Sequence, residues 1–189
     1  MIDRLILIRH SQSQPTPGEP PSLWPLTAAG RARCELLAER LRPYDLDLIV
    51  GSDERKTRET AALAAARLGL PCSSAPDLHE HRREHTSWMQ QHAFDAAVAG
   101  GFARPGELVF GEETFAQARE RFGRAVRAVL AANPDRRLAI VAHGTVLALF
   151  VAQHAGIAPL PFWRSLGMPA IVALSLPDFS LLDVAARVE

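Results

Sequence analysis

The chain carries two short, unbroken aliphatic runs, and a histidine lies at the end of each. Residues 5–8 lead into Arg9 and His10, and residues 138–142 lead into His143. Aliphatic runs of this length are typical of parallel strands that are buried on both faces. In open sheets of such strands, the reacting groups lie just beyond the carboxyl ends. The two runs therefore predict a parallel sheet with two imidazoles at one edge.

Helical patterns follow these and other strand-like runs along the chain. Thr27 suits the N-cap of a helix, Ser52 suits the cap of a second helix that reaches about Leu68, and apolar spacing predicts a third from Phe115 to Leu130. A further helix is expected from His143 to Gly156. Strands are expected at residues 46–50, 71–75, 170–176 and 181–185, and residues 79–111 form the least regular stretch.

Alternation of strand and helix predicts a doubly wound α/β fold, because a strand followed by a crossover helix returns parallel to its neighbour. We expect one domain over residues 1–189, a three-layer α/β/α sandwich whose mostly parallel sheet has an antiparallel strand at its edge. A chain of 189 residues is within the size that one core can serve.

Charge and cysteine content exclude several classes of function. The 21 basic and 21 acidic residues balance, so no partnership with nucleic acid is indicated. No run of eighteen apolar residues occurs, and the first apolar run is too short for a signal peptide, so we expect no membrane association. Cys34 and Cys72 lack metal-ligand spacing; as small core residues without a disulfide, they favour a cytoplasmic location.

The residues at the two strand ends suit phosphoryl chemistry. Arg9 can bind phosphate oxygens in a planar fork, and His10 offers a nitrogen that is nucleophilic near neutral pH. His143 can neutralise the transferred group, and the amides after it open a helix and can donate to phosphate, Gly144 first among them. The pattern predicts a phosphate site with His10 as the nucleophile.

Six segments, in order, resemble the histidine phosphatase superfamily, which is also called phosphoglycerate mutase-like. They are the Arg-His strand end at residues 7–11, the Leu-Thr-x-x-Gly helix start at 26–30, the Ser-to-Thr-Ala helix at 52–61, the Leu-x-Glu at 78–80, the Gly-x-Glu helix start at 111–114 and the second histidine strand end at 141–144. The resemblance spans most of the chain.

The resemblance implies a metal-independent phosphomonoesterase that needs no cofactor. It implies a phosphohistidine on His10, protonation of the leaving group by Glu80 and hydrolysis by water. The residues implied around the phosphate are Arg9, Lys56 and His143, with Ser11, Ser13, Thr16 and Gly144 as contacts. Ser11 stands where the family usually has Gly, and Lys56 stands where it usually has a second Arg, which keeps the charge but loses the bidentate fork.

Several alternatives stay open. Glu84 lies four residues after Glu80 and could serve as the acid if this segment is helical. His81, Glu84 and His85 have the spacing of an inverted zinc-protease motif. A phosphate-binding module with little turnover, or a phosphotransferase of the mutase type, would use the same pocket. The substrate could be a small phosphorylated metabolite or a phosphoprotein. The irregular stretch of residues 79–111 also contains large apolar side chains that we expect either to pack in the core or to line the leaving-group pocket: Trp88, Met89, Phe94, Phe102 and Phe110.

Overall fold

In the computed structural model, which describes residues 3–188, six strands form one mixed sheet in the order β3-β2-β4-β1-β5-β6. The strands are β1 (Arg4–Arg9), β2 (Leu48–Ser52), β3 (Cys72–Ala75), β4 (Leu138–Ala142), β5 (Ala170–Ser175) and β6 (Leu181–Ala185). The helices are α1 (Ala28–Leu41), α2 (Arg55–Leu68), α3 (Gln91–Ala103), α4 (Phe115–Ala132), α5 (Gly144–Ala155) and α6 (Pro159–Ser165), with short 3-10 turns η1 (Pro21–Leu23) and η2 (Arg42–Tyr44).

The register of β1 against β4 positions the site. The two strands pair in parallel, with Arg9 opposite Ala142, so both chains leave the sheet at the same level. Strands β2 and β3 are parallel to them, whereas β5 runs antiparallel to β1 and to β6, the strand at that edge. The expectation of a mostly parallel sheet with antiparallel pairing at one edge is confirmed.

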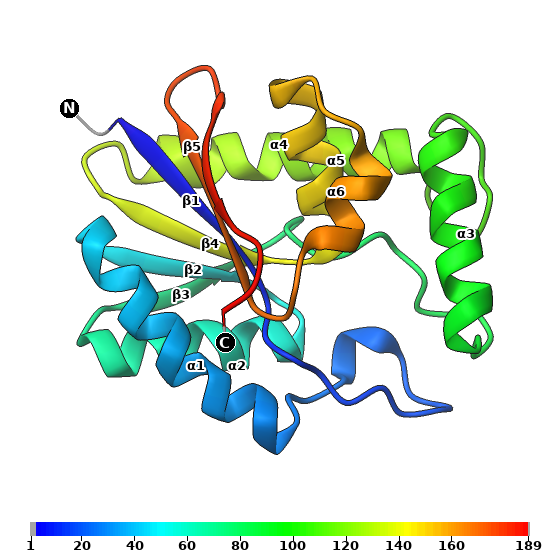
Figure 1. Ribbon diagram of the computed structural model, residues 1–189, viewed down its shortest axis with the longest axis horizontal. Helices are drawn as coiled ribbons and strands as arrows, with labels where there is room; N and C mark the ends of the chain where they lie inside the picture. The colour runs from blue at the N-terminus through cyan, green and yellow to red at the C-terminus, as the bar shows by residue number, and fades with distance from the viewer. Residues whose placement is uncertain (1–2, 189) are drawn as a thin grey trace.

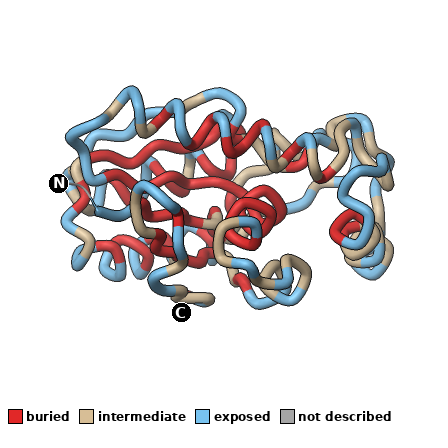
Figure 2. Tube along the Cα trace, turned by 90° about the horizontal axis from the view of Figure 1, so that it is seen from above, coloured by how far each residue is buried: buried red, intermediate tan, exposed pale blue. Residues whose placement is uncertain are grey.

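Helices cover both faces of the sheet, which explains the continuous aliphatic character of its central strands. Helices α1 and α2 pack on one face, and α4 and α5 pack on the other (Figure 1). Along β1, Leu5 and Leu7 join the core beneath α4 and α5, while Ile6 and Ile8 join the core beneath α1 and α2. Figure 2 shows buried residues running along the strands and exposed residues on the outer sides of the helices.

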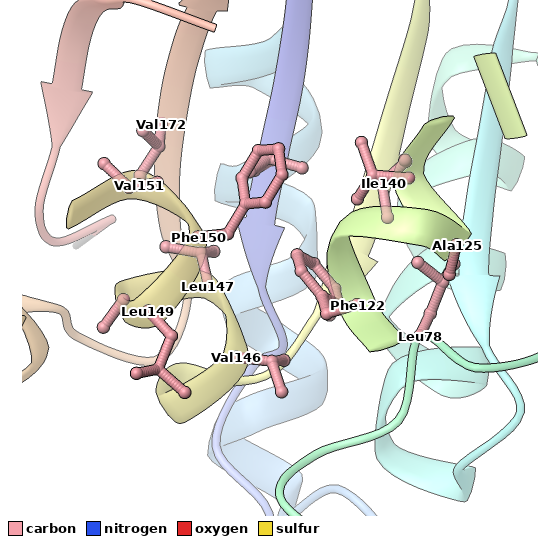
Figure 3. Packing of buried hydrophobic residues seen from close by; sticks show 14 of the residues in the cluster. Leu78, Phe122, Ala125, Ile140, Val146, Leu147, Leu149, Phe150, Val151 and Val172 are labelled. Atoms are coloured by element: carbon pink, nitrogen blue, oxygen red, sulfur yellow. The ribbon is translucent and has the colours of Figure 1, made fainter. Parts of the chain in front are cut away.

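Two aromatic side chains join the helices of the α4–α5 layer. The ring centroids of Phe122 and Phe150 lie 5.7 Å apart in an edge-to-face arrangement, and both side chains are buried (Figure 3). Burial of such rings is a large part of what holds helices on a sheet. This packing fixes α5, whose first residue follows His143 directly.

The expected helix cap at Ser52 was wrong. Ser52 is the last residue of β2 and is fully buried, and α2 begins three residues later with Glu54 as its N-cap. The strand itself lies two residues later than expected. Pairing of β2 with β3 and β4 extends it to Ser52, so tertiary hydrogen bonds override the local preference of serine for a cap.

Helices α3 and α6 were missed by the sequence analysis. Helix α3 lies inside the stretch expected to be irregular, and Figure 1 shows it standing beside the sandwich, on the side toward which β4 points. It buries only Val98, Gly101 and Phe102, so it carries little of the periodic signal that reveals a helix. Cys72 was also placed wrongly, since it is exposed at the edge strand β3, whereas Cys34 is buried as expected.

Among the described residues, no helix is both long enough and apolar enough to span a membrane.

Gly30 allows α1 to approach the backbone that follows β1. A Cβ atom at position 30 would lie 2.2 Å from the carbonyl oxygen of Gln12. The hydroxyl of Ser11 donates to the carbonyl of Gly30 at 2.7 Å, and Thr27 accepts a hydrogen bond from the Gly30 amide at 2.9 Å. The start of α1 is thereby fixed against the chain that carries His10.

Replacing Gly30 by alanine should therefore lower the free energy of unfolding by about 1–3 kcal/mol, because the clashing atom belongs to backbone and cannot rotate away. Gly106→Ala is the matched control, since a Cβ there would meet nothing within 4 Å. Urea unfolding of both variants checks this expectation. Equal stabilities for the two variants would contradict the close approach.

Candidate active site

The two predicted histidines lie side by side at the ends of β1 and β4. The amide of His10 donates to the carbonyl of Ala142 at 3.0 Å, and the imidazole centroids of His10 and His143 lie 5.3 Å apart. His10 is 6% exposed and His143 is fully buried. The strand register thus brings together two imidazoles that are 133 positions apart in sequence, from position 10 to position 143.

The tautomer of His10 is fixed by a backbone carbonyl. Its Nδ1 lies 2.7 Å from the carbonyl oxygen of Ser11, and since a carbonyl can only accept, Nδ1 carries the proton. Burial lowers the pKa of His10 well below its usual value, and the neighbouring side chains of His143, Lys56 and Arg9 act in the same direction. The ring is therefore neutral at neutral pH, with its lone pair on Nε2.

The imidazole of His143 is held by polar groups at the end of β2 and the start of α2. Its Nε2 lies 2.7 Å from the hydroxyl oxygen of Ser52 and 3.4 Å from Oε1 of Glu54. Thr57 donates its hydroxyl proton to the carbonyl of Glu54, so Ser52 can donate to Thr57 and accept from Nε2–H. Burial lowers the pKa of His143 well below its usual value, as does Lys56 nearby. Its Nδ1 is buried and has no hydrogen-bond partner among residues 3–188.

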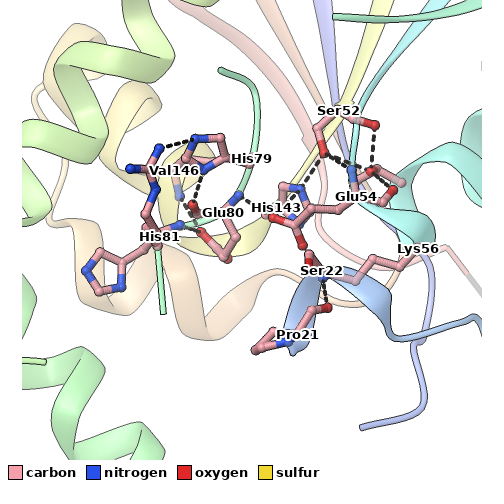
Figure 4. A network of polar contacts seen from close by, with 12 residues as sticks. Pro21, Ser22, Ser52, Glu54, Lys56, His79, Glu80, His81, His143 and Val146 are labelled. Atoms are coloured by element: carbon pink, nitrogen blue, oxygen red, sulfur yellow. Dashed lines mark hydrogen bonds and ion pairs between the residues drawn. The ribbon is translucent and has the colours of Figure 1, made fainter. Parts of the chain in front are cut away.

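Glu54 is a member of the site that the sequence analysis missed. Its Oε1 accepts the backbone amide of Glu80 at 2.8 Å and faces His143, while its Oε2 pairs with Lys56 (Figure 4). Burial opposes the charged form of Glu54, yet its pKa lies below the usual value because of the Lys56 charge and hydrogen bond. The available signal in the sequence was an acid two positions before Lys56.

Lys56 is therefore not a free cation. Its side chain is buried, and besides Glu54 its Nζ donates to the carbonyl of Pro21 at 2.7 Å. This bond connects α2 to η1, which lies in the proline-rich loop of residues 14–25. Arg55 and Arg58, which lie on either side of Lys56 in the sequence, are exposed.

The carboxylate of Glu80 occupies the amino end of α5. Oε2 accepts the amide of Thr145 at 3.0 Å, and Oε1 accepts the amides of Val146 at 3.2 Å and His81 at 2.8 Å. Two of the helix amides that we expected to hold phosphate thus hold Glu80 instead. Glu84 accepts the hydroxyl of Ser22 at 2.6 Å, so of the two candidate acids it is Glu80 that lies beside the second histidine.

Arg9 and Gly144 lie against each other. A Cβ at position 144 would lie 3.0 Å from Cζ of Arg9, so glycine makes room for the guanidinium. Nη1 of Arg9 donates to the carbonyl of Leu166, whereas Nε is buried without a partner in the described chain. Burial lowers the pKa of Arg9, and Glu80 opposes that shift.

The three hydroxyl residues expected at the phosphate differ in their surroundings. Ser11 is buried and directs its hydroxyl to Gly30, while its amide donates to Thr60 at 3.1 Å, so its side chain faces α1 and α2. Ser13 forms an isolated bridge with Leu26. Thr16 is half-buried, and its hydroxyl donates to a neighbouring carbonyl at 3.4 Å.

The zinc-protease spacing does not produce a metal site. His81 is buried between Phe110 and Phe115, and its Nε2 contacts the carbonyl of Glu113 at 2.7 Å. His85 is exposed, while Glu84 contacts the proline-rich loop. Over residues 3–188, no three His, Cys, Asp or Glu side chains are grouped so that they could hold a metal ion.

The lowered pKa values of His10 and His143 predict acid sensitivity. In the unfolded chain both imidazoles take up a proton near pH 6.5, but in the folded protein they stay neutral to much lower pH. The unfolded state therefore binds more protons below pH 6.5, and the free energy of unfolding falls on acidification by up to about 1.4 kcal/mol per pH unit for each ring.

Urea unfolding between about pH 8 and about pH 5 checks this, with the double variant His10→Gln/His143→Gln as the comparison. The double variant should lose stability less steeply below pH 6.5 than the natural protein. An identical slope in both proteins would show that other groups cause the acid sensitivity.

The chain is similar to known proteins over most of its length. A curated relative, the adenosylcobalamin/alpha-ribazole phosphatase of Escherichia coli K12, is 27% identical over 85% of this chain and 83% of its own. A probable phosphoglycerate mutase of Yersinia enterocolitica is 25% identical over 82% of this chain and 76% of its own. A solved mycobacterial glucosyl-3-phosphoglycerate phosphatase shares the fold, with a TM-score of 0.75, 22% identity and 98% of each chain covered. The family model described as "Histidine phosphatase superfamily (branch 1)" matches residues 5–177, so the chain belongs to this superfamily.

Proposed function

We propose that the protein is a metal-independent phosphomonoester hydrolase that works through a phosphohistidine on His10. The observation that supports this best is the bond from Nδ1 of His10 to the carbonyl of Ser11, which leaves a lone pair on Nε2 of a neutral, buried ring. The ring centroid of His143 lies 5.3 Å from that of His10, and Arg9 directly precedes His10 in the sequence. Nucleophile and positive groups are the parts that phosphoryl transfer needs.

In the first step, Nε2 of His10 attacks phosphorus, and the bond between phosphorus and the ester oxygen breaks. The departing oxygen takes a proton from Glu80 and leaves as an alcohol. We assign the proton to Oε2, because this oxygen accepts one backbone amide whereas Oε1 accepts two. Arg9 neutralises the transferred group, and Lys56 contributes from the side where it pairs with Glu54. His143 joins them once its Nδ1, which has no partner among the described residues, takes up a proton as the anionic ester binds.

In the second step, water attacks the phosphorus of the phosphohistidine and gives a proton to Glu80. The bond between nitrogen and phosphorus breaks, inorganic phosphate leaves, and the lone pair returns to Nε2 of His10. The amide of Gly144 and the side chains of Ser13 and Thr16 are proposed to contact the phosphate. For Ser11 we propose a backbone role, because its hydroxyl is engaged with Gly30.

The relatives are compatible with hydrolysis and with phosphotransfer. One is named as a phosphatase and another as a probable mutase, so the phosphotransferase remains the second candidate. We favour a small phosphorylated metabolite as substrate and a cytoplasmic enzyme. A phosphate-binding module with little turnover is the outcome if no phosphoenzyme forms.

A rapid-quench experiment with a ³²P-labelled activated phosphate ester and a chelator tests the nucleophile. The natural protein should trap an acid-labile, base-stable phosphate, and His10→Ala should trap none, because no other nitrogen occupies its position. His92→Ala is the matched control, since His92 is an exposed residue of α3 and the control should label like the natural protein. Full labelling of His10→Ala would refute the mechanism, and loss of activity with the chelator would refute metal independence.

The role of Glu80 is tested by varying the leaving group. Glu80→Gln should slow the hydrolysis of alkyl phosphates about 10²–10⁴-fold but affect nitrophenyl phosphate much less, because a good leaving group needs no proton. Glu84→Gln removes the same charge four residues on and should show no such dependence. Equal losses on both classes of ester for Glu80→Gln would assign the proton to another group.

A further inference from the structure

Arg83 is a cation without an acceptor at the edge of the site. Its guanidinium carbon lies 4.6 Å from the ring centroid of Phe94 and 5.6 Å from that of Trp24. Its side chain makes no hydrogen bond or ion pair with any residue from 3 to 188, although a guanidinium has five N–H donors. Burial lowers the pKa of Arg83, and the charges of Glu80, Glu54 and Glu84 oppose that shift.

Other charged groups of this region have partners among the described residues, although Nε of Arg9 has none. Arg9 donates to a carbonyl, and Lys56 has both a carbonyl and Glu54. Of the remaining carboxylates, Glu80 holds three backbone amides and Glu84 holds a serine hydroxyl. Besides Nε of Arg9 beside the nucleophile, the guanidinium of Arg83 has no acceptor in the described chain, so its donors would suit an acceptor that arrives from outside.

The position of Arg83 connects it to the proposed phosphate site. Nζ of Lys56 lies 6.0 Å from the centroid of the same Trp24 ring, so the two cations share one aromatic neighbour. Arg83 lies three residues after Glu80, and its charge contributes to the lowered pKa of His143. The two aromatic faces restrain the guanidinium and leave its N–H edge available.

We propose that Arg83 binds a second anionic group of the substrate, a carboxylate or a second phosphate carried by the alcohol part of the ester. The inference rests on the proposed function, because it names the substrate class of that same site. The natural substrate would then be a phosphate ester with two separated anionic groups. Both groups offer the paired oxygens that the planar guanidinium recognises.

Phosphonates test this proposal without any turnover, because they contain no ester bond to break. The probes are phenylphosphonate, the 3- and 4-phosphonobenzoates, and benzene-1,4-diphosphonate, whose binding is measured by calorimetry. The proteins are the natural chain, Arg83→Met, Arg83→Lys and Arg82→Met. Arg82 is exposed, so Arg82→Met removes the same net charge next to the site and is the matched control.

We expect the natural protein and Arg82→Met to bind at least one doubly anionic probe about tenfold to a hundredfold more tightly than phenylphosphonate. Arg83→Met should lose this preference, and Arg83→Lys should keep only part of it because lysine lacks the fork. Preference for a phosphonobenzoate identifies a carboxylate, and preference for the diphosphonate identifies a second phosphate.

Two results would overturn the proposal. One is a natural protein with no preference for a second anion, and the other is an Arg83→Met variant that weakens all probes equally, which would indicate a structural role between the aromatic rings. Phosphoenzyme trapping on the same preparations separates this proposal from the catalytic one. If the natural protein shows no preference but labels normally, the role of Arg83 is contradicted, whereas a natural protein that shows the preference but does not label contradicts the hydrolase.

Discussion

The parallel pairing of β1 with β4 is the constraint on which the site depends. The register opposes Arg9 to Ala142, and the next amide, that of His10, bonds to the Ala142 carbonyl, so both histidines leave the sheet at one level. The pairing is possible because helices cover both faces of the sheet and bury the aliphatic residues of the two strands. A displacement by one residue would turn the strand's side chains to opposite faces and separate the imidazoles.

Buried polar contacts then decide what each imidazole can do. A backbone carbonyl assigns the proton of His10 to Nδ1, and Ser52 with Glu54 engages Nε2 of His143. Glu54 also binds the amide of Glu80 and the ammonium of Lys56, which in turn holds the proline-rich loop. A single carboxylate therefore links the second histidine, the proposed acid and, through Lys56, the proline-rich loop, and these elements should respond together when it is changed.

The sequence alone was sufficient for the sheet, the two histidines and Arg9, because each of these follows from an aliphatic run and the residue that ends it. The polar partners could not be predicted in the same way. Ser52 has the local signature of a helix cap, but strand pairing and His143 place it in β2. From the sequence, the amide of Thr145 was expected to be free to donate to phosphate. Only the folded chain shows that this amide donates to the carboxylate of Glu80 instead. Such contacts join segments far apart in sequence, so no local pattern encodes them.

The central claim is that His10 presents an unprotonated Nε2 from a neutral ring, and ¹⁵N NMR of the imidazole nitrogens measures this directly. The signals of His10 are assigned by their loss in His10→Gln. At neutral pH we predict a proton on Nδ1 and none on Nε2, and the neutral form should persist below pH 6.5 because burial lowers the pKa of His10. A proton on Nε2, or a doubly protonated ring at neutral pH, would contradict the account.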